Sequence, residues 1–298
     1  MTERYLDLNG TTLFVDDRGD PRAPALLYVH GGPGMSCFDF MAVQGDRLAG
    51  SLRLVGVDQR GVLRSGPVGT QPLTIETLIA DFEAVRDRLG ISSWTVLGHS
   101  AGGSYVLDYA LEHPETVGSV IFDCPCWDAD STDRHRLPVA ADLLQRYGHT
   151  EEAARCRELA AFDRRLTAAD ETHAAVQALG ERYQELFFHD SEAQKRFEHL
   201  LEGSGLGDES WARGTSHATL MEDLYVDRMP LLAKLAQPSL LQHGAHDLVT
   251  SPQMIERYRS DVPTGSVVTF EESGHFCHHE QPELYADTVA TFVKEQAR

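Results

Sequence analysis

Apolar and polar positions alternate along the chain in a way that predicts short strands near both of its ends. Residues 4–8 and 12–18 flank Asn9 and Gly10, a pair typical of a two-residue hairpin turn. Short apolar runs, typical of strands buried on both faces, occupy residues 25–30, 53–58, 94–98, 118–123, 238–244 and 266–272. Eight strands are therefore expected.

Helical periodicity fills the intervals between several of these strands. In residues 73–90, Ile75, Leu78, Phe82 and Val85 fall on one face, and Gly90 marks the end of the helix. Further helices are predicted at 103–114, 251–260 and 281–296. Residues from about 124 to 236 are rich in Ala, Glu, Arg and Leu, and no strand is predicted there.

The alternation of strands and helices predicts an α/β fold in which helices cover both faces of a mostly parallel sheet. The helical interval follows the sixth predicted strand, so we interpret it as an inserted cap. The predicted core domain comprises residues 1–123 and 237–298, and the predicted cap domain comprises residues 124–236.

Composition and charge indicate which kinds of binding partner and which cellular compartment are expected. The chain has 298 residues, 42% of them apolar, and a formal net charge of −20, which disfavours nucleic acid as a partner. No apolar run approaches the length of a membrane span, and the start of the chain lacks the apolar segment of a signal peptide. Five cysteines without a repeated spacing fit a reducing compartment. We expect a cytoplasmic protein with no membrane partner, and the sequence leaves its oligomeric state open.

The strongest chemical signal is the stretch Gly98-His-Ser-Ala-Gly102, which lies between a predicted strand and a predicted helix. G-x-S-x-G in that setting is typical of a nucleophile elbow, a turn so tight that only small neighbours fit beside the serine. A glycine-rich turn whose serine caps the helix is the structural alternative. We predict that Ser100 is a nucleophile.

A serine nucleophile requires a base and an acid that orients the base, and in the elbow architecture they follow in the order acid, then histidine. Asp247 lies just beyond the strand at 238–244, and His275 just beyond the strand at 266–272. Carboxyl ends of parallel strands meet at one edge of a sheet, so the three residues should converge. Asp123, at the end of the strand at 118–123, is a rival acid; we favour Asp247 because of its loop, His243-Gly-Ala-His-Asp247.

The segment His30-Gly-Gly-Pro-Gly34 follows another predicted strand. Gly31 and Gly32 carry no side chains, so a backbone N–H can face a developing oxyanion. We predict that Gly32 and Ala101 donate the two N–H groups of an oxyanion hole. No metal is predicted, although His275, Cys277, His278, His279 and Glu280 lie close together in sequence, because their spacing matches no common zinc pattern.

With these motifs the chain resembles the α/β-hydrolase superfamily and, more narrowly, the proline iminopeptidase group. The motifs that carry the resemblance are residues 30–34, Asp58-Gln-Arg-Gly61 followed by Ser65, residues 98–103, Asp247 and Ser273-Gly-His275. The resemblance implies an α/β-hydrolase fold and a hydrolase that needs no cofactor and acts on a small molecule or short peptide. Some members bind the substrate's amine through a glutamate directly after the acid, where this chain has Leu248; others use glutamates of the cap.

Three kinds of function remain open at this point. Release of an N-terminal proline or another small residue ranks first, ester or lactone hydrolysis ranks second, and a ligand-binding protein without hydrolytic activity ranks last. Gly31 and three cap residues, Trp127, Glu222 and Tyr225, are candidates for contact with the substrate.

Overall fold

The structure is a computed structural model and describes residues 2–297. One sheet of eight strands has the order β1-β2-β4-β3-β5-β6-β7-β8. The strands are β1 Thr2–Leu8, β2 Thr11–Arg18, β3 Ala25–Val29, β4 Arg53–Asp58, β5 Trp94–His99, β6 Val117–Asp123, β7 Ser239–Gly244 and β8 Ser266–Phe270. β2 runs antiparallel to both of its neighbours, and every other neighbouring pair from β4 to β8 is parallel. The predicted mostly parallel sheet of eight strands is confirmed.

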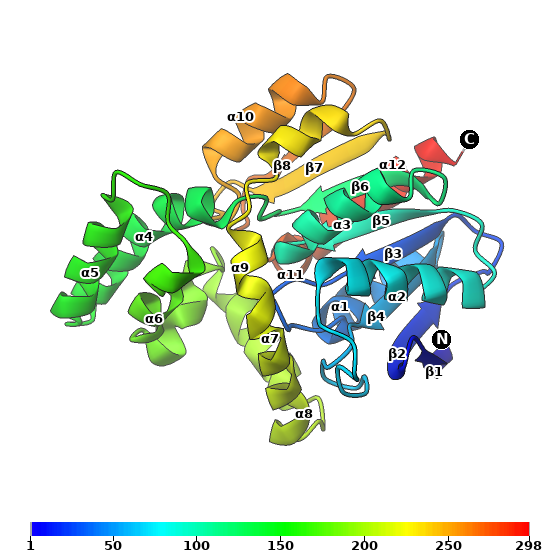
Figure 1. Cartoon of the computed structure of the whole chain (residues 1–298), viewed down its shortest axis with the longest axis horizontal. Helices are drawn as coiled ribbons and strands as arrows, with labels where there is room; N and C mark the ends of the chain where they lie inside the picture. The colour runs from blue at the N-terminus through cyan, green and yellow to red at the C-terminus, as the bar shows by residue number, and fades with distance from the viewer. Residues whose placement is uncertain (1, 298) are drawn as a thin grey trace.

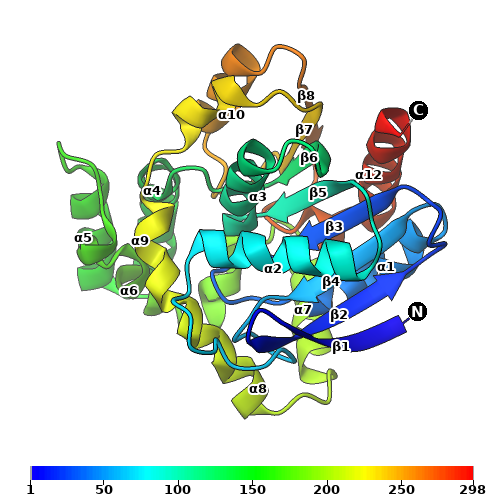
Figure 2. The same ribbon diagram turned by 45° about the vertical axis from the view of Figure 1, so that its right-hand side comes forward.

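The predicted hairpin forms the first edge of this sheet (Figure 2). Leu8 pairs with Thr11, so Asn9 and Gly10 alone make the turn. Their φ angles of 48° and 78° are both positive, as a type I′ turn requires, and Asn and Gly are the residues that tolerate this region best.

Helices cover both faces of the sheet. α2 (Ile75–Arg88), α3 (Ala101–Glu112) and α10 (Pro252–Asp261) pack their apolar residues into one large cluster with the strands. α1 (Phe38–Ala49), α11 (Cys277–Glu280) and α12 (Pro282–Gln296) belong to the cluster on the other face. Figures 1 and 2 show α2 and α3 on one side of the strands and α12 on the other.

α1 was not predicted from the sequence, and its polar buried face explains why. Asp39, Gln44 and Gly45 are buried in this helix and interrupt its apolar pattern. The amide of Gln44 donates to the backbone oxygens of His278 and Pro282 at 2.8 and 3.1 Å. A partner that is distant in sequence therefore stabilises a helix face that periodicity alone would place in solvent.

Between β6 and β7 the chain is helical and lies beyond one end of the sheet (Figure 1). The segments are α4 Ala129–Arg146, α5 Thr150–Ala160, η1 Ala168–Asp170, α6 Thr172–Gln177, η2 Gly180–Leu186, α7 Ser191–Glu202, α8 Asp208–Ala212, η3 Arg213–Leu220, α9 Met221–Leu224 and η4 Met229–Lys234. α4, α5 and α6 share an apolar cluster of their own that includes Leu137, Leu144 and Leu159. The division into two domains at residues 124 and 236 stays a prediction.

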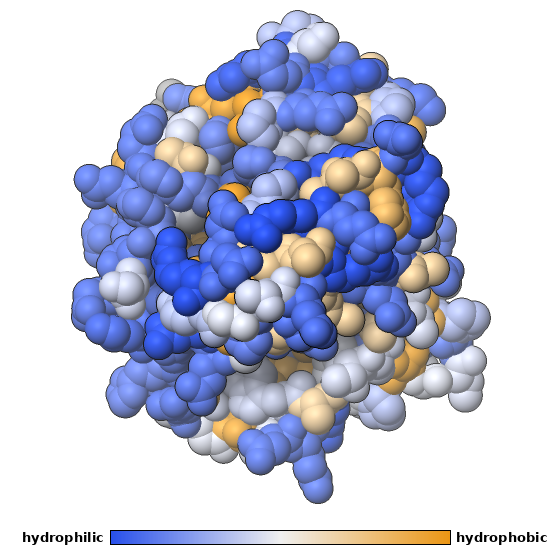
Figure 3. Space-filling view, turned by 90° about the vertical axis from the view of Figure 1, so that its left-hand side faces the viewer, coloured by the Kyte–Doolittle hydropathy of each residue, from blue (hydrophilic) through white to orange (hydrophobic). Residues whose placement is uncertain are grey.

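The surface on this side of the molecule is mostly hydrophilic, with apolar side chains scattered over it (Figure 3). Within residues 2–297, no helix has both the length and the apolar character that crossing a membrane requires.

Candidate active site

The predicted nucleophile lies in a tight turn between β5 and α3. Ser100 has φ 57° and ψ −123°, a backbone conformation that L-residues adopt only under constraint. Its N–H donates to Asp123 O at 2.9 Å, and its carbonyl accepts from Gly103 N at 2.9 Å and Cys126 N at 3.0 Å. These three bonds hold the turn in a conformation that is unfavourable by itself.

The glycines around Ser100 are required by close backbone contacts. A Cβ atom on Gly98 would collide with the carbonyl of Gly102, and one on Gly102 would collide with the carbonyl of Val29. A Cβ on Gly103 would lie 2.5 Å from the side chain of Pro125. The glycine cluster therefore reflects close packing at the elbow rather than a flexible loop.

Asp247 and His275, which follow β7 and β8, come together next to this turn. His275 Nδ1 lies 2.9 Å from Asp247 Oδ1, and both residues are buried. Asp247 also accepts N–H bonds from Val249 at 2.9 Å and Thr250 at 3.1 Å. The two backbone bonds fix the carboxylate in its own loop, so it faces the imidazole only while that loop keeps its shape.

The electrostatics of this pair favour an ionised acid and a neutral base. Burial alone would raise the pKa of Asp247, but the charge and hydrogen bond of His275 and the two backbone N–H groups hold it below its usual range. Burial lowers the pKa of His275, and the neighbouring Asp247 only partly offsets this effect. A neutral imidazole whose Nδ1 is protonated leaves Nε2 free to accept a proton.

The rival acid Asp123 has a different imidazole as its partner. Asp123 Oδ2 lies 2.9 Å from His99 Nδ1, and Asp123 Oδ1 accepts from the amide of Gln242 at 3.0 Å. The ring of His99 lies 4.6 Å from that of His275, so two imidazole–carboxylate pairs stand side by side. A role for His99 was not predicted from the sequence, although its position directly before Ser100, at the end of a buried strand, was the available signal.

The glycine loop after β3 approaches the elbow through Gly31. A Cβ on Gly31 would lie 2.7 Å from Ser100 Cβ and 3.1 Å from Ala101 N. Gly32 is exposed and has φ 117°, which only glycine adopts readily. Ala101 is the first residue of α3, so its N–H has no acceptor within the helix. Ala101 therefore follows Ser100 directly, and Gly32 follows the glycine that approaches Ser100 most closely on this loop.

The cap residues suggested from the sequence are placed differently from one another. Trp127 is fully buried, stacks on Tyr258 and meets Phe122 edge to face, so it belongs to the core and offers no surface to a substrate. This corrects the expectation that Trp127 lines a pocket. Glu222 is exposed on α9, and the hydroxyl of Tyr225 donates to Asp133 at 2.6 Å.

Three buried groups of potential metal ligands occur within residues 2–297: Asp39 with His278 and His279, His99 with Asp123 and His278, and Cys124 with Asp247 and His275. In the first group, Asp39 Oδ2 lies 3.4 Å from His278 Nε2 and 3.3 Å from His279 Nε2. The other two groups contain the hydrogen bonds of Asp123 and Asp247 described above. Hydrogen bonds thus join Asp39 to both histidines of the first group and one pair of residues in each of the other two groups, and the absence of a metal stays a prediction.

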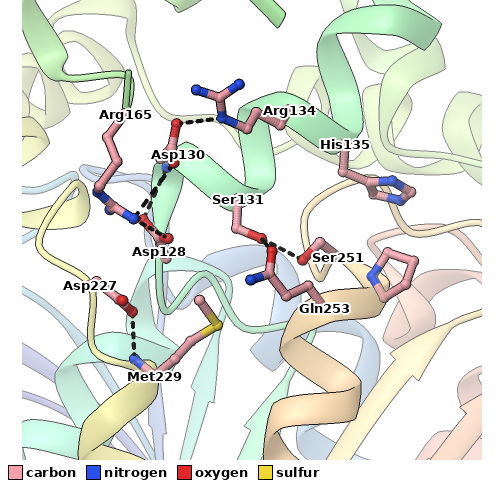
Figure 4. A pocket seen from close by; sticks show the side chains of 11 residues that line it. Asp128, Asp130, Ser131, Arg134, His135, Arg165, Asp227, Met229, Ser251 and Gln253 are labelled. Carbon is pink, nitrogen blue, oxygen red and sulfur yellow. Dashed lines mark hydrogen bonds and ion pairs between the residues drawn. The ribbon is translucent and has the colours of Figure 1, made fainter. Parts of the chain in front are cut away.

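A pocket of about 300 Å³ lies between the first turns of α4 and α10 (Figure 4). Two of its carboxylates are already paired, because Arg165 lies 2.6 Å from Asp128 and 3.5 Å from Asp130. The third, Asp227, accepts the backbone N–H of Met229 at 2.9 Å. Neither Ser100, Asp247 nor His275 lines it. We therefore regard this pocket as a charged junction between α4, the Arg165 segment and α10, separate from the candidate active site.

Comparisons with known proteins agree with the fold. A family model described as alpha/beta hydrolase fold matches residues 24–282. A protein named proline iminopeptidase from Heyndrickxia coagulans is 26% identical over 302 residues, which cover 98% of each chain. The crystal structure of a proline iminopeptidase-related protein from Thermus thermophilus superposes with a TM-score of 0.78 at 23% identity, covering 99% of this chain and 98% of that one. An enol-lactonase from Burkholderia xenovorans gives a TM-score of 0.69 at 19% identity, covering 98% and 100%.

Proposed function

The chain belongs to the α/β-hydrolase family, and from that premise we propose that it is a serine hydrolase that works through Ser100, His275 and Asp247. The observation that carries the proposal is the 2.9 Å bond between His275 Nδ1 and Asp247 Oδ1 beside a serine held in a strained turn. A serine hydrolase needs this combination, because a serine hydroxyl is a weak nucleophile unless an oriented base removes its proton.

The proposed reaction has two halves that share one base. Ser100 Oγ attacks the substrate's carbonyl carbon while His275 Nε2 takes the hydroxyl proton. Asp247 stays ionised and stabilises the imidazolium. His275 then gives this proton to the leaving amine or alcohol, which leaves an acyl group on Ser100. Water, deprotonated by the same imidazole, attacks the acyl group and regenerates the serine.

The negative charge on the carbonyl oxygen needs donors that are in place before the reaction. We assign this role to the N–H groups of Ala101 and Gly32. Loss of one such donor typically costs about 3 kcal/mol of transition-state stabilisation. The short approach of Gly31 to Ser100 supports the assignment, because it brings the loop that contains Gly32 to the elbow.

Release of an N-terminal proline or another small residue is the substrate reaction that we rank first. The support for this ranking is the full-length similarity to a protein named proline iminopeptidase. An exopeptidase of this kind needs a carboxylate or other acceptor for the substrate's free amine.

Hydrolysis of esters or lactones is the second candidate, and one feature of the cap favours it. Asp133 is a buried cap carboxylate, but Arg136 pairs with it at 2.6 Å, and hydroxyl groups of Tyr225 and Thr172 donate to it at 2.6 and 2.8 Å. A carboxylate that is neutralised in this way is a poor acceptor for an amine. Leu248, directly after Asp247, offers no carboxylate either.

Labelling with a serine-reactive fluorophosphonate tests the proposal. The wild type should be labelled and Ser100→Ala should not. Ser104→Ala is the matched control, because Ser104 lies one turn along α3 and bonds to the carbonyl of Cys126 instead. An unlabelled, folded wild type would refute a serine mechanism and favour a protein that only binds its ligand.

The two substrate classes are separated by turnover of proline and alanine arylamides beside short acyl esters and lactones. Preference for the arylamides supports the first candidate. Turnover of esters with none of any arylamide bearing a free amine would eliminate it and leave the second.

A further inference from the structure

The segment Phe187–Asp190, between η2 and α7, lies against both loops that carry the acid and the base. Phe187 O accepts the backbone N–H of His275 at 2.7 Å, and the ring of Phe187 lies 5.6 Å from the ring of His275. His189 stacks on His246, the residue before Asp247, with ring centroids 3.6 Å apart and planes 3° from parallel. One short stretch of the cap thus contacts His275 and the residue that precedes Asp247.

Glu280, the last residue of α11, joins this segment to the loop of His275. Glu280 Oε1 accepts the N–H groups of His189 at 2.6 Å and of Asp190 at 2.8 Å. Glu280 Oε2 accepts the N–H of Gly274 at 2.7 Å. Bonds from a carboxylate to backbone N–H groups are stronger than neutral ones. Gly274 is the buried residue of the three, and a buried N–H left without an acceptor carries the full cost of its desolvation.

The approach between the two segments is close enough to restrict their sequence. A Cβ atom on Gly274 would lie 3.1 Å from His189 N and would collide with the carbonyl of Phe187. Below this contact, Phe188 stacks on Phe276 with centroids 4.8 Å apart. Apolar packing and hydrogen bonds therefore hold the same two segments together.

We propose that Glu280 is a positioning residue for His275: its carboxylate binds Phe187–Asp190 to the loop of Gly274 and so holds the catalytic imidazole against Asp247. We call Glu280 together with residues 187–190 the clasp. This inference rests on the proposed function, because it assigns His275 as the base. It adds a residue that touches no substrate and acts through the backbone on either side of His275.

Protonation of Glu280 would weaken its hydrogen bonds to residues 187–190 and to Gly274 unequally. Burial raises the pKa of Glu280 to about 7, although its three backbone hydrogen bonds act in the opposite direction and the charge of Asp190 raises it slightly further. Oε1 has two N–H partners and Oε2 has one, so the proton enters on Oε2 at the lower cost. The bond from Gly274 is then lost while His189 and Asp190 stay bound.

The groups around Glu280 do not compensate its charge. Asp190, directly before α7, lies 3.6 Å from Arg196. The other titratable neighbours of Glu280 are three histidines: His189 in the clasp, His246 in the loop of Asp247, and His279 in α11. No arginine or lysine of residues 2–297 forms an ion pair with Glu280.

Because burial lowers the pKa of His275, the fall of kcat/KM on the acid side of pH 7 should reflect protonation of Glu280 rather than of the base itself.

Glu280→Gln tests this inference, with Glu283→Gln as the matched control on the exposed start of α12. The amide keeps the size of the side chain but cannot accept all three N–H bonds, and it cannot ionise. Displacement of a catalytic group by about 1 Å costs about 100-fold, so we expect kcat to fall by about 10- to 100-fold while KM changes little. The acid limb near pH 7 should disappear from the variant, and Glu283→Gln should behave as the wild type.

Amide hydrogen exchange gives a readout that does not depend on catalysis. Exchange at His189, Asp190 and Gly274 should rise in Glu280→Gln, and in the wild type exchange at Gly274 should rise, after correction for the intrinsic rate, as the pH falls from 8 to 6. Faster exchange with an unchanged kcat and pH profile would overturn the positioning role. If exchange changed neither in Glu280→Gln nor, between pH 8 and 6, in the wild type, the clasp itself would be overturned. If the exchange pattern were as expected but the wild type were not labelled by the fluorophosphonate, only the proposed function would be refuted.

Discussion

Replacing Asp247 by Asn is the perturbation that discriminates best between the two buried acids. The change keeps the size of the side chain and, with the amide oxygen at the position of Oδ2, the acceptor for the N–H of Thr250, whereas the N–H of Val249 loses its acceptor at Oδ1. Its amide NH₂ would then face His275 Nδ1 and force the imidazole proton onto Nε2. An imidazole in that tautomer cannot accept the proton of Ser100.

The size of the effect follows from the distance between the two groups. Asp247 Oδ1 lies 2.9 Å from His275 Nδ1, and at an effective dielectric constant of about 20 the attraction between a carboxylate and an imidazolium at that distance is about 6 kcal/mol. About 1.4 kcal/mol corresponds to each tenfold change in rate. We therefore expect kcat to fall by about 10⁴-fold, the scale found when the acid of a serine–histidine–aspartate triad is replaced by asparagine.

Asp123→Asn is the matched control, because Asp123 makes the same 2.9 Å contact with His99 and is equally buried. It should cost less than about tenfold in kcat and should instead lower the free energy of unfolding by about 1–3 kcal/mol, through the bonds lost to His99 and Gln242. Turnover of the best ester or arylamide gives kcat, and urea unfolding gives stability. Near-normal activity of a folded Asp247→Asn, or a 10⁴-fold loss in Asp123→Asn, would refute the assignment.

Two further predictions concern the elbow and the acid stability of the fold. Gly31→Ala should lower kcat by at least about 100-fold, because the added Cβ would lie 2.7 Å from Ser100 Cβ. Gly118→Ala is the control and should leave kcat unchanged, because the nearest contact of its Cβ would be at 3.8 Å. Equal kcat values for the two variants would contradict the packing argument. Partial burial would raise the pKa of Glu83, but hydrogen bonds from Arg86 and two hydroxyl groups lower it to about 2, so its contribution to stability is complete above about pH 4.5 and is lost as the pH falls toward 2. Urea unfolding at pH 5, 4 and 3 should show that the wild type loses more free energy of unfolding than Glu83→Gln over this range, and parallel losses would refute it.

The hairpin and the strands could be read from the sequence because their signals are local. Asn9 and Gly10 make the turn by their own backbone preferences, and each apolar run needs only a sheet to bury it. α1 could not be read in this way. Its buried Asp39 and Gln44 find their partners at His278, His279 and Pro282, more than 230 residues away.

The candidate site was predictable for the residues that a motif or a strand end identifies. Ser100 lies in a G-x-S-x-G turn, and Asp247 and His275 follow strands whose carboxyl ends share one edge. Trp127 was assigned to the pocket from its residue type alone, and the structure buries it between Phe122 and Tyr258. Residue type alone does not show whether an aromatic ring just before a helix packs into the core or lines a pocket.

What the sequence by itself determined is the set of groups that meet at the edge of the sheet: a serine in a turn of glycines, two aspartates and one histidine, His275. Each of these residues ends or follows a predicted strand, and the carboxyl ends of parallel strands meet at one edge of a sheet. Only the tertiary structure decided which carboxylate faces which imidazole, and that Glu280, in a histidine-rich run, binds the backbone of the cap. The physical reason is that both pairings depend on hydrogen-bond geometry within a few ångströms. The packing of the loops against the cap sets this geometry, and the local preferences of the chain do not.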